Sequence, residues 1–482
     1  MRFLEKVHPF IVLYFLIFIV FFPILFLKKL FPGFDLTLIF YPYSHNFLNQ
    51  QSFWTSGILS GFNIGITPNA FAGNWIYYEF LNFGFLDFIS FYNVLIFSYF
   101  ILTAAFSYLA SRKIGFDKYV SVLVASVYIF SAYNLSWMVN IVTAASLFVF
   151  PALIYFLLKF RENFNWVWPA VGGVVLGLSL ITSHPQFALI AIFGGFLFSI
   201  FLAWEADESK PRDPTPGFRI LRGRIPEISV DTWQWKFLLA FLLICAIGLA
   251  LSAFQLIPEY QTSRLAQRGL ALSFSESQEC ALGVADFVRY VIPNFNFGVN
   301  CESLLYVGAL PLILAILAII YLKKDKRVLF WLLLLAFSLL FSITYSPLAW
   351  IFHQLPIWSS LRGPARFMML GNFALAVLSG YGFNWILEQK ENIGKLKVFS
   401  CFKRIFFGFL TLIIGINILG LFKATFIKWA QDYFDKYYYT KTIGLPIEHY
   451  HRAIENLVSN NFYDFSFLNK EFLIPFILSV GA

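Results

Sequence analysis

Apolar residues gather in long runs that recur along nearly the whole chain. The first run, FIVLYFLIFIVFFPILFL at positions 10–27, contains no charged side chain. A helix needs about 20 mostly apolar residues to cross the hydrocarbon core of a bilayer. Runs of comparable length cover 92–110, 119–137, 140–158, 166–183, 186–204, 237–256, 304–322, 328–345, 367–387 and 405–422. The pattern predicts an all-α, polytopic integral membrane protein with about 11–12 transmembrane helices.

The two ends of the chain carry apolar runs of different kinds. The first run follows a basic start with Arg2 and Lys6, but Lys28 and Lys29 follow it where a signal peptide would have small residues for cleavage. We therefore expect an uncleaved first span. The last run begins near 471 and stops at Ala482. Because this run is too short for a spanning helix, we expect 471–482 to be the start of a truncated last span.

Composition and charge support this class of protein. The chain is 59% hydrophobic and only 13% charged, whereas soluble domains carry about 25% charged residues. With the N-terminus in the cytoplasm and alternating spans, most of the 35 lysines and arginines fall on the cytoplasmic side, as the positive-inside rule requires. The net charge of +9 therefore indicates a multi-pass topology in a plasma or inner membrane rather than a nucleic-acid partner.

The predicted spans leave loops of very unequal length. In the first outer loop, HNFLNQQSFWTSGIL separates apolar from polar positions with the period of a helix, which predicts a helix lying in the membrane interface. The stretch that follows, GFNIGITPNAFAGNW, predicts repeated turns. We expect a transmembrane domain over 1–422, with outer loops at 28–91, 257–303 and 346–366, a cytoplasmic linker at 205–236, and an outer segment at 423–470.

The outer loops contain the candidate chemistry. Asp35, in the run FPGFDLTLIFYPYSHN, is a lone carboxylate close to the expected headgroup level. Taken singly, this acid and the clusters on its side of the membrane suit helix caps, loop charges or arginines anchored at lipid phosphates. Together they suit transfer from a lipid phosphate, with a carboxylate as general base and fixed cations for the leaving phosphate. The clusters are ITSHPQF with His184, SAFQLIPEYQTSRLAQR with Glu259 and Arg264, and LPIWSSLRGPARF with Arg362 and Arg366.

Two further features leave alternatives open. Cys280 and Cys301 lie in one outer loop, where oxidising conditions permit a disulfide, but two unrelated thiols fit equally well. No spacing of acidic residues specifies a cage for a hard cation, and His449-Tyr450-His451 resembles a metal pair only superficially. The residues thus predict no definite cofactor and leave a divalent metal open.

A series of motifs follows in a set order along the chain. It comprises Asp35 with Tyr41-Pro42, the Gly/Pro/Asn-rich stretch 57–74, Ser183-His184-Pro185-Gln186, Gln255-Leu256-Ile257-Pro258-Glu259 followed by Arg264, Tyr306-Val307-Gly308, and Leu355-Pro356 through Arg362-Gly363-Pro364-Ala365-Arg366. This order resembles that of the YfhO-type bacterial membrane proteins, a branch of the GT-C glycosyltransferase superfamily. The chain departs from the family at Phe34, where a glycine is usual before the aspartate, and at Phe62-Asn63, where Trp-Asn is usual. These departures concern the substrate more than the fold.

The resemblance implies a GT-C-like fold with a large first outer loop bearing interfacial helices, and a membrane glycosyltransferase activity. Such an enzyme would move a sugar, with inversion, from a polyprenyl-phosphate donor to an acceptor hydroxyl on an envelope polymer, lipid or protein at the outer face. Some members of the superfamily hold a divalent metal on first-loop acids, and others do not. The resemblance implies Asp35 as general base, and donor-phosphate or substrate binding by Tyr41, His184, Glu259, Arg264, Arg362 and Arg366.

Two other classes of function stay open. A transporter or flippase for a lipid-linked substrate would show broken helices and ionisable residues at mid-membrane, whereas the predicted spans contain no lysine or arginine. A non-catalytic envelope-assembly protein derived from the same fold is compatible with every motif. A nucleic-acid partner is not expected.

Overall fold

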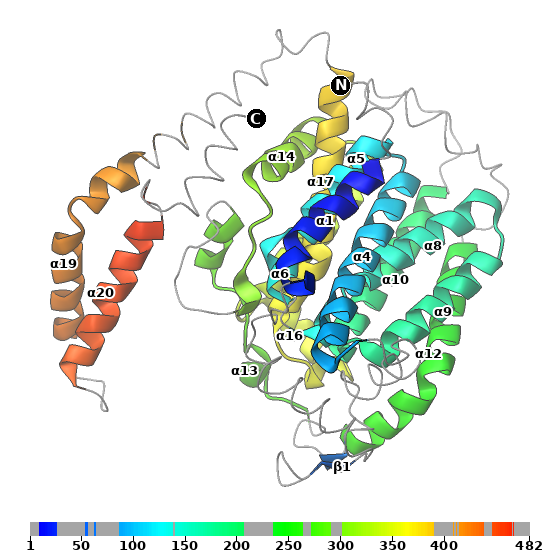
Figure 1. Cartoon of the computed structure of the whole chain (residues 1–482), viewed down its shortest axis with the longest axis horizontal. Coiled ribbons are helices and arrows are strands. Elements are labelled where there is room, and N and C mark those ends of the chain that lie inside the picture. The colour runs from blue at the N-terminus through cyan, green and yellow to red at the C-terminus, as the bar shows by residue number, and fades with distance from the viewer. Residues whose placement is uncertain are drawn as a thin grey trace. The chain divides into compact units, whose positions relative to one another are not determined.

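Figure 1 shows the computed structural model of the chain. The chain divides into two compact units, one formed by residues 1–283 and 301–385 and the other by 284–300 and 386–482. The structure describes residues 9–26, 54–55, 62–63, 86–137, 140–206, 235–263, 271–290, 301–389, 408, 411, 414–437, 446–464 and 466.

Helices and the loops that join them make up the described residues, apart from one antiparallel pair of two-residue strands, β1 (Trp54–Thr55) and β2 (Phe62–Asn63), and an isolated bridge between Leu282 and Ile343. The prediction of an all-α chain is therefore confirmed. The helices of the first unit are α1 (Pro9–Phe26), α4 (Phe88–Ile114), α5 (Lys118–Ile129), α6 (Ala132–Ser136), α7 (Ile141–Ala144), α8 (Val149–Asn163), α9 (Val167–Thr182), α10 (Pro185–Ala206), α12 (Trp235–Ser263), α13 (Phe274–Ser277), α14 (Ala309–Leu322), α15 (Lys326–Ser342), α16 (Pro347–His353), and α17 (Met368–Glu388), which continues past the unit's last residue; short 3-10 turns are η6 (Cys301–Ser303), η7 (Trp358–Ser360) and η8 (Pro364–Phe367).

Several of these helices have the length and composition of membrane spans. In the part of the chain that the structure describes, five apolar helical stretches are long enough to cross a bilayer. They are Ser90–Ile114, Ile141–Asn163, Pro185–Glu205, Trp235–Gln261 and Pro364–Glu388. Each overlaps an apolar run of the sequence, because a run without charges favours a helix that satisfies its own backbone hydrogen bonds.

The helix α17 lies at the centre of the first unit (Figure 1). It buries nearly every side chain from Met368 to Trp385. The ring of Phe373 packs edge-on against Tyr128 of α5 and Phe150 of α8, with ring centroids 5.1 and 5.5 Å apart. At Gly382 the backbone of α14 approaches so closely that a Cβ atom would lie 1.9 Å from the carbonyl oxygen of Leu314. This α14–α17 contact therefore requires a glycine.

The helix α12, unlike α17, leaves many of its side chains exposed. Apolar side chains stay exposed along much of its length, including Leu242, Leu249, Phe254 and Ile257. A soluble protein would bury such a face, whereas a membrane helix can leave it against lipid tails.

The predicted span 119–137 is broken in the structure. The run 119–137 was expected to form a single helix, but α5 ends at Ile129 and Ser131 starts α6 by accepting a hydrogen bond from the amide of Asn134. The Asn134 side chain in turn donates to the carbonyl oxygen of Tyr128 at 2.7 Å. These side-chain bonds compete with the backbone ladder of a continuous helix. With 12 residues, α5 is about 18 Å long and does not cross the hydrocarbon core alone.

The predicted interfacial helix in the first outer loop is also wrong at its end. Trp54 and Thr55 form β1 and pair with Asn63 and Phe62 of β2. Aromatic and β-branched residues such as Trp54 and Thr55 favour strands. The rest of that predicted helix lies outside the described residues.

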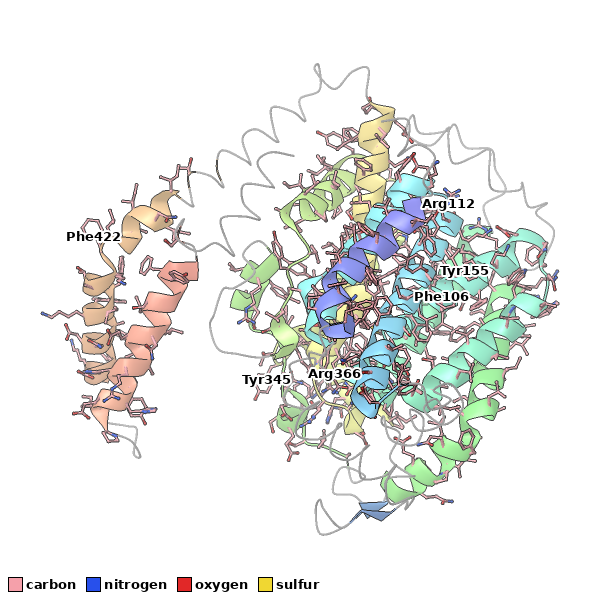
Figure 2. The ribbon with its side chains drawn as sticks, in the orientation of Figure 1. Phe106, Arg112, Tyr155, Tyr345, Arg366 and Phe422 are labelled. Atoms are coloured by element: carbon pink, nitrogen blue, oxygen red, sulfur yellow. The ribbon has the colours of Figure 1, made fainter. Side chains whose placement is uncertain are left out.

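The ion pairs that join helices of the first unit fall into two groups. Arg161 of α8 and Arg327 of α15 both bind Glu205 of α10, at 2.7 and 2.6 Å. With the N-terminus in the cytoplasm and alternating spans, all three residues fall on the predicted cytoplasmic side. Arg366 binds Glu302 at 2.9 Å, and both belong to predicted outer positions. Figure 2 places Arg112, predicted to be cytoplasmic, and Arg366 toward opposite ends of the helices. Alternating spans predict this separation.

The second unit contains a helical hairpin. Its helices are α19 (Lys423–Tyr437) and α20 (Ile447–Asp464), and a short 3-10 helix, η5 (Val284–Tyr290), belongs to the same unit. Phe434 stacks on Tyr450 with ring centroids 5.2 Å apart, and His451 Nε2 lies 2.8 Å from Asp435 Oδ1. His451 thus pairs with an acid of the neighbouring helix.

Candidate functional site

Hydrogen bonds from several distant segments hold the loop from Arg362 to Arg366. It precedes α17 and is shaped by Gly363, whose φ of +73° is rarely adopted by residues with a side chain. A Cβ atom added at Gly363 would lie 2.9 Å from Glu302 Oε2 and 3.0 Å from Arg366 Nε. Both the backbone conformation and the lack of space therefore require glycine here.

Arg366 is buried at the base of this loop. Its Nε and Nη2 donate hydrogen bonds of 3.0 and 2.9 Å to one oxygen of Glu302, and its Nη1 donates to Gln186 Oε1 at 2.6 Å. The guanidinium carbon also lies 5.6 Å from the ring centre of Phe187 and 6.0 Å from that of Trp137, which adds cation–π attraction. A buried charge is tolerated only when it is paired and hydrogen-bonded in this way.

Gln186 uses both ends of its amide to join the two arginines. Its Oε1 accepts from Arg366, and its Nε2 donates to the backbone carbonyl oxygen of Arg362. Gln186 lies at the start of α10, where His184 acts as a cap because its Nδ1 accepts a hydrogen bond from the Gln186 amide at 3.2 Å. The predicted site residue His184 therefore sets the beginning of the helix that carries Gln186.

Three further hydrogen bonds fix the backbone of the loop. The amide of Gly363 donates to the carbonyl oxygen of Ser277 at 3.2 Å. The hydroxyl of Ser342 donates to the carbonyl oxygen of Pro364 at 3.1 Å, and the hydroxyl of Tyr133 donates to the carbonyl oxygen of Arg366 at 3.2 Å. Segments remote in sequence thus converge on five consecutive residues, so the loop is preorganised.

The carboxyl of Glu302 depends on its partner for its charge. Glu302 is buried, and this burial raises the pKa of its carboxyl above the usual value. The guanidinium of Arg366 acts in the opposite direction and lowers the pKa. Removal of Arg366 would therefore favour the neutral acid.

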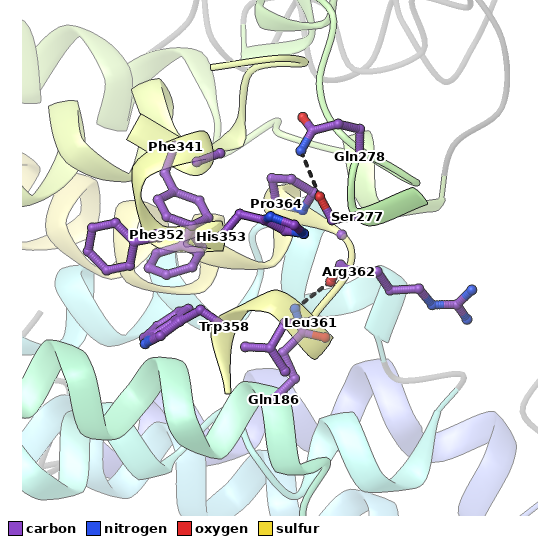
Figure 3. A pocket seen from close by; sticks show the side chains of 13 residues that line it. Gln186, Ser277, Gln278, Phe341, Phe352, His353, Trp358, Leu361, Arg362 and Pro364 are labelled. Carbon is purple, nitrogen blue, oxygen red and sulfur yellow. Dashed lines mark hydrogen bonds between the residues drawn. The ribbon is translucent and has the colours of Figure 1, made fainter. Parts of the chain in front are cut away.

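A small pocket borders the loop (Figure 3). Its volume is about 30 Å³, enough for ordered water or a small polar group. Figure 3 shows the guanidinium of Arg362 pointing away from the aromatic side chains; it pairs with the exposed carboxylate of Glu279. The lining residues are Gln186, Ser277, Gln278, Phe341, Ala349, Phe352, His353, Trp358, Leu361, Arg362, Gly363, Pro364 and Phe367.

Backbone strain gathers in the segments around this pocket. Cys280, Tyr345 and Ile357 have positive φ values of 62°, 55° and 73°. Such a conformation costs about 1–3 kcal/mol for a residue with a side chain, and the β-branched Ile357 is the most unusual. Gln278 stabilises one strained position, because its Oε1 accepts from the amide of Tyr345 at 2.8 Å. Strain of this kind is concentrated at functional sites.

The structure brings together part of the predicted site. Arg362, Arg366 and His184 belong to one hydrogen-bonded network with Gln186. Glu259 lies near the end of α12, and its Oε2 is buried without a hydrogen-bond partner among the described residues. Asp35, Tyr41, Arg264 and the side chain of Cys301 lie outside the described residues, so their roles and the disulfide with Cys280 stay predictions.

Glu302 and Gln186 are network residues that the sequence reasoning did not assign to the site, and Glu302 was not singled out at all. Glu302 stands in the run CES directly before an apolar run on the predicted outer side. One signal could have identified it: Arg366 directly precedes a predicted span, and a charge so close to the hydrocarbon requires a partner. An acid at the start of another span on the same side is the natural candidate.

Metal ligands do not cluster in the described part of the chain. No three histidine, cysteine, aspartate or glutamate side chains gather there at a point that could hold a metal ion. Compared with known proteins, the chain matches no family model, no curated sequence and no solved structure. The function must therefore be argued from the residues and their geometry.

Proposed function

We propose that the chain is a membrane glycosyltransferase of GT-C type, which moves a sugar from a polyprenyl-phosphate donor to an envelope hydroxyl on the outer face. The observation that carries the proposal is the convergence of Gln186, Glu302 and the loop 362–366 in one network. Two of these segments belong to motifs that resemble the family, and they are far apart in sequence. The fixed, positively charged loop is suited to a phosphate at the membrane surface.

The two arginines of the loop would have different tasks. The nitrogens of Arg366 are engaged by Glu302 and Gln186, so this residue positions the loop. The Arg362 side chain is 34% exposed and pairs with a Glu279 side chain that is 56% exposed. Exposed ion pairs contribute little free energy, so a donor phosphate can replace Glu279 as the partner of Arg362. Arg264 would supply a second cation.

The chemistry follows from the bonds that change. The oxygen of the acceptor hydroxyl attacks the anomeric carbon, and the bond from that carbon to the phosphate oxygen breaks with inversion. The hydroxyl proton passes to the carboxylate of Asp35, and the leaving polyprenyl phosphate keeps the electron pair. A positioned general base is worth about 10²–10⁴-fold in rate.

Sugar transfer by purified protein from radiolabelled polyprenyl-phosphate sugars tests this function. Asp35→Asn should lose about 10²–10⁴-fold in rate and still bind donor, because it removes the base and keeps the size of the side chain. Asp117→Asn is the matched control: Asp117 caps α5 through its side chain, and asparagine caps a helix equally well.

Two results would contradict the proposal in different ways. Equal transfer by wild type and Asp35→Asn would remove Asp35 from the mechanism. Absence of transfer by wild type across a panel of donors would favour the transporter or the envelope-assembly protein.

A further inference from the structure

The second unit exposes a row of aromatic side chains on α19 and the turn before it. Phe422, Phe426, Trp429, Tyr433 and Tyr437 form this row, which we term the aromatic stripe, and they are between 39% and 65% exposed. Their spacing of three or four residues places them on one face of a helix. Consecutive rings also contact one another: Trp429 and Tyr433 have centroids 5.8 Å apart, and Tyr433 and Tyr437 4.8 Å.

Another face of α19 is occupied by α20. Phe434 stacks on Tyr450, Asp435 binds His451, and the amide of Gln431 donates to the carbonyl oxygen of His451 at 3.2 Å. Within the stripe, Phe426 also contacts Phe462 of α20, with ring centroids 5.7 Å apart. Trp429, Tyr433 and Tyr437 thus continue the stripe as an exposed apolar surface beside the face that α20 covers. An exposed apolar patch of this kind on a folded unit marks a surface that contacts a protein, a membrane or a ligand.

The stripe begins at the last residue of the predicted span 405–422. Ile414, Ile418, Leu419 and Leu421 precede the stripe and are exposed, and they belong to the predicted span 405–422. Helix 414–420 ends in a turn at 421–422, where the chain changes direction before α19 (Figure 1). A chain that leaves the bilayer can therefore turn α19 along its surface.

The residue types on the stripe fit the interfacial layer of a bilayer. The two phenylalanines stand next to the span, and Trp429, Tyr433 and Tyr437 follow. Tryptophan and tyrosine are enriched at membrane interfaces because each has an apolar ring and a polar group. An upright α19 would carry Tyr437 about 22 Å beyond Phe422, well past a headgroup layer of roughly 5–8 Å.

We propose that α19 lies in the outer interface of the membrane, with the aromatic stripe inserted among the lipid headgroups and α20 packed on its other side. The hairpin is then held at the membrane surface by aromatic insertion at the level of the lipid headgroups. This inference rests on the span 405–422 and is independent of sugar transfer.

Fluorescence quenching by lipids tests the orientation of α19. The full chain, with its four cysteines replaced by alanine, receives one cysteine at Tyr437→Cys or at Lys428→Cys and an environment-sensitive dye. The variants are reconstituted in phosphatidylcholine vesicles that contain a lipid with a nitroxide high on its acyl chain. Lys428 is the matched control, because it is exposed, lies on the face opposite Tyr437 and is closer to the span.

The proposal predicts a larger loss of emission at 437 than at 428. An upright helix predicts the reverse order, since 428 is nearer the bilayer, and that result would overturn the proposal. Absence of quenching at both positions would overturn it too, because the stripe would then be covered by protein or a soluble ligand.

A second measurement keeps the native cysteines in case the substituted chain does not fold. The difference between the tryptophan emission spectra of the wild type and Trp429→Phe reports on Trp429 alone. This difference spectrum should be blue-shifted, and brominated lipid should quench it. A red-shifted, unquenched difference would place Trp429 in water and contradict the proposal.

Discussion

Glu302 and Arg366 are 64 positions apart in sequence, yet two nitrogens of the arginine lie 2.9 and 3.0 Å from one oxygen of the glutamate. Both residues are buried, so the pair is shielded from the water that weakens surface ion pairs. The pair links η6, which precedes α14, to the loop that precedes α17. Its geometry fixes where the positively charged loop stands relative to the helices.

Glu302→Gln should destabilise the protein by about 3–5 kcal/mol, because it leaves the buried guanidinium of Arg366 without a countercharge. The measurement is the unfolding transition of purified protein in detergent. Glu279→Gln is the control, since that carboxylate is exposed and its pair with Arg362 should be worth about 0–1 kcal/mol. Equal losses in the two variants would contradict the structural role of Glu302.

A double variant separates stability from function. Glu302→Leu with Arg366→Met replaces the pair by apolar side chains, which often restores or raises stability. We expect this variant to unfold near the wild-type transition but to bind donor poorly, because the link from Arg366 to Gln186 is lost. Wild-type donor use by the stable double variant would show that the network does not position the loop for donor binding.

The two arginines of the loop should respond differently to lysine. Arg366→Lys keeps the charge but loses the planar fork that reaches Glu302 and Gln186 together, so both stability and donor use should fall. Arg362→Lys should unfold like wild type and raise the KM for donor, because lysine cannot grip a phosphate bidentately. Arg264→Lys is expected to resemble Arg362→Lys. Unchanged donor kinetics in Arg362→Lys would reduce Arg362 to a surface charge.

Gly363→Ala should destabilise the loop by about 1–2 kcal/mol from its left-handed backbone alone. The added Cβ would also crowd Glu302 Oε2, so donor use should fall together with the unfolding temperature. Gly415→Ala is the matched control, because no described atom lies within 4 Å of a Cβ placed there and alanine favours a helix. Wild-type stability in Gly363→Ala would contradict the conformation assigned to the loop.

The sequence predicts the helices of this fold better than it predicts their ends and contacts. Long uncharged runs predict helices because a bilayer allows few other structures. The break at Ser131 was missed because it depends on two local hydrogen bonds, to Ser131 and from Asn134, within a run whose composition is otherwise that of a span. Trp54–Thr55 was misassigned because a helical period can occur by chance in a short aromatic segment.

The sequence predicted the two arginines of the candidate site but not the residues that bind them. Arg362 and Arg366 stand out in the sequence because arginines at the start of an apolar run are unusual. Glu302 does not, since a single acid in a loop is common. Gln186 lies 180 positions from Arg366, and only the packed helices bring the two together.

The last prediction concerns the two faces of the membrane. Single cysteines introduced at 57 and 440, in a chain without its native cysteines, should react with an impermeant thiol reagent added to sealed cells, whereas one at 215 should not. The first reason is the distribution of basic residues along the chain. The second is that the ion pairs of Glu205 lie among predicted cytoplasmic residues, whereas the ion pair of Glu302 lies among predicted outer residues. Permeabilised cells provide the control, since all three positions should then react. Labelling of 215 in sealed cells would overturn the topology, and it would move the loop 362–366 to the wrong side for a sugar acceptor in the cell envelope.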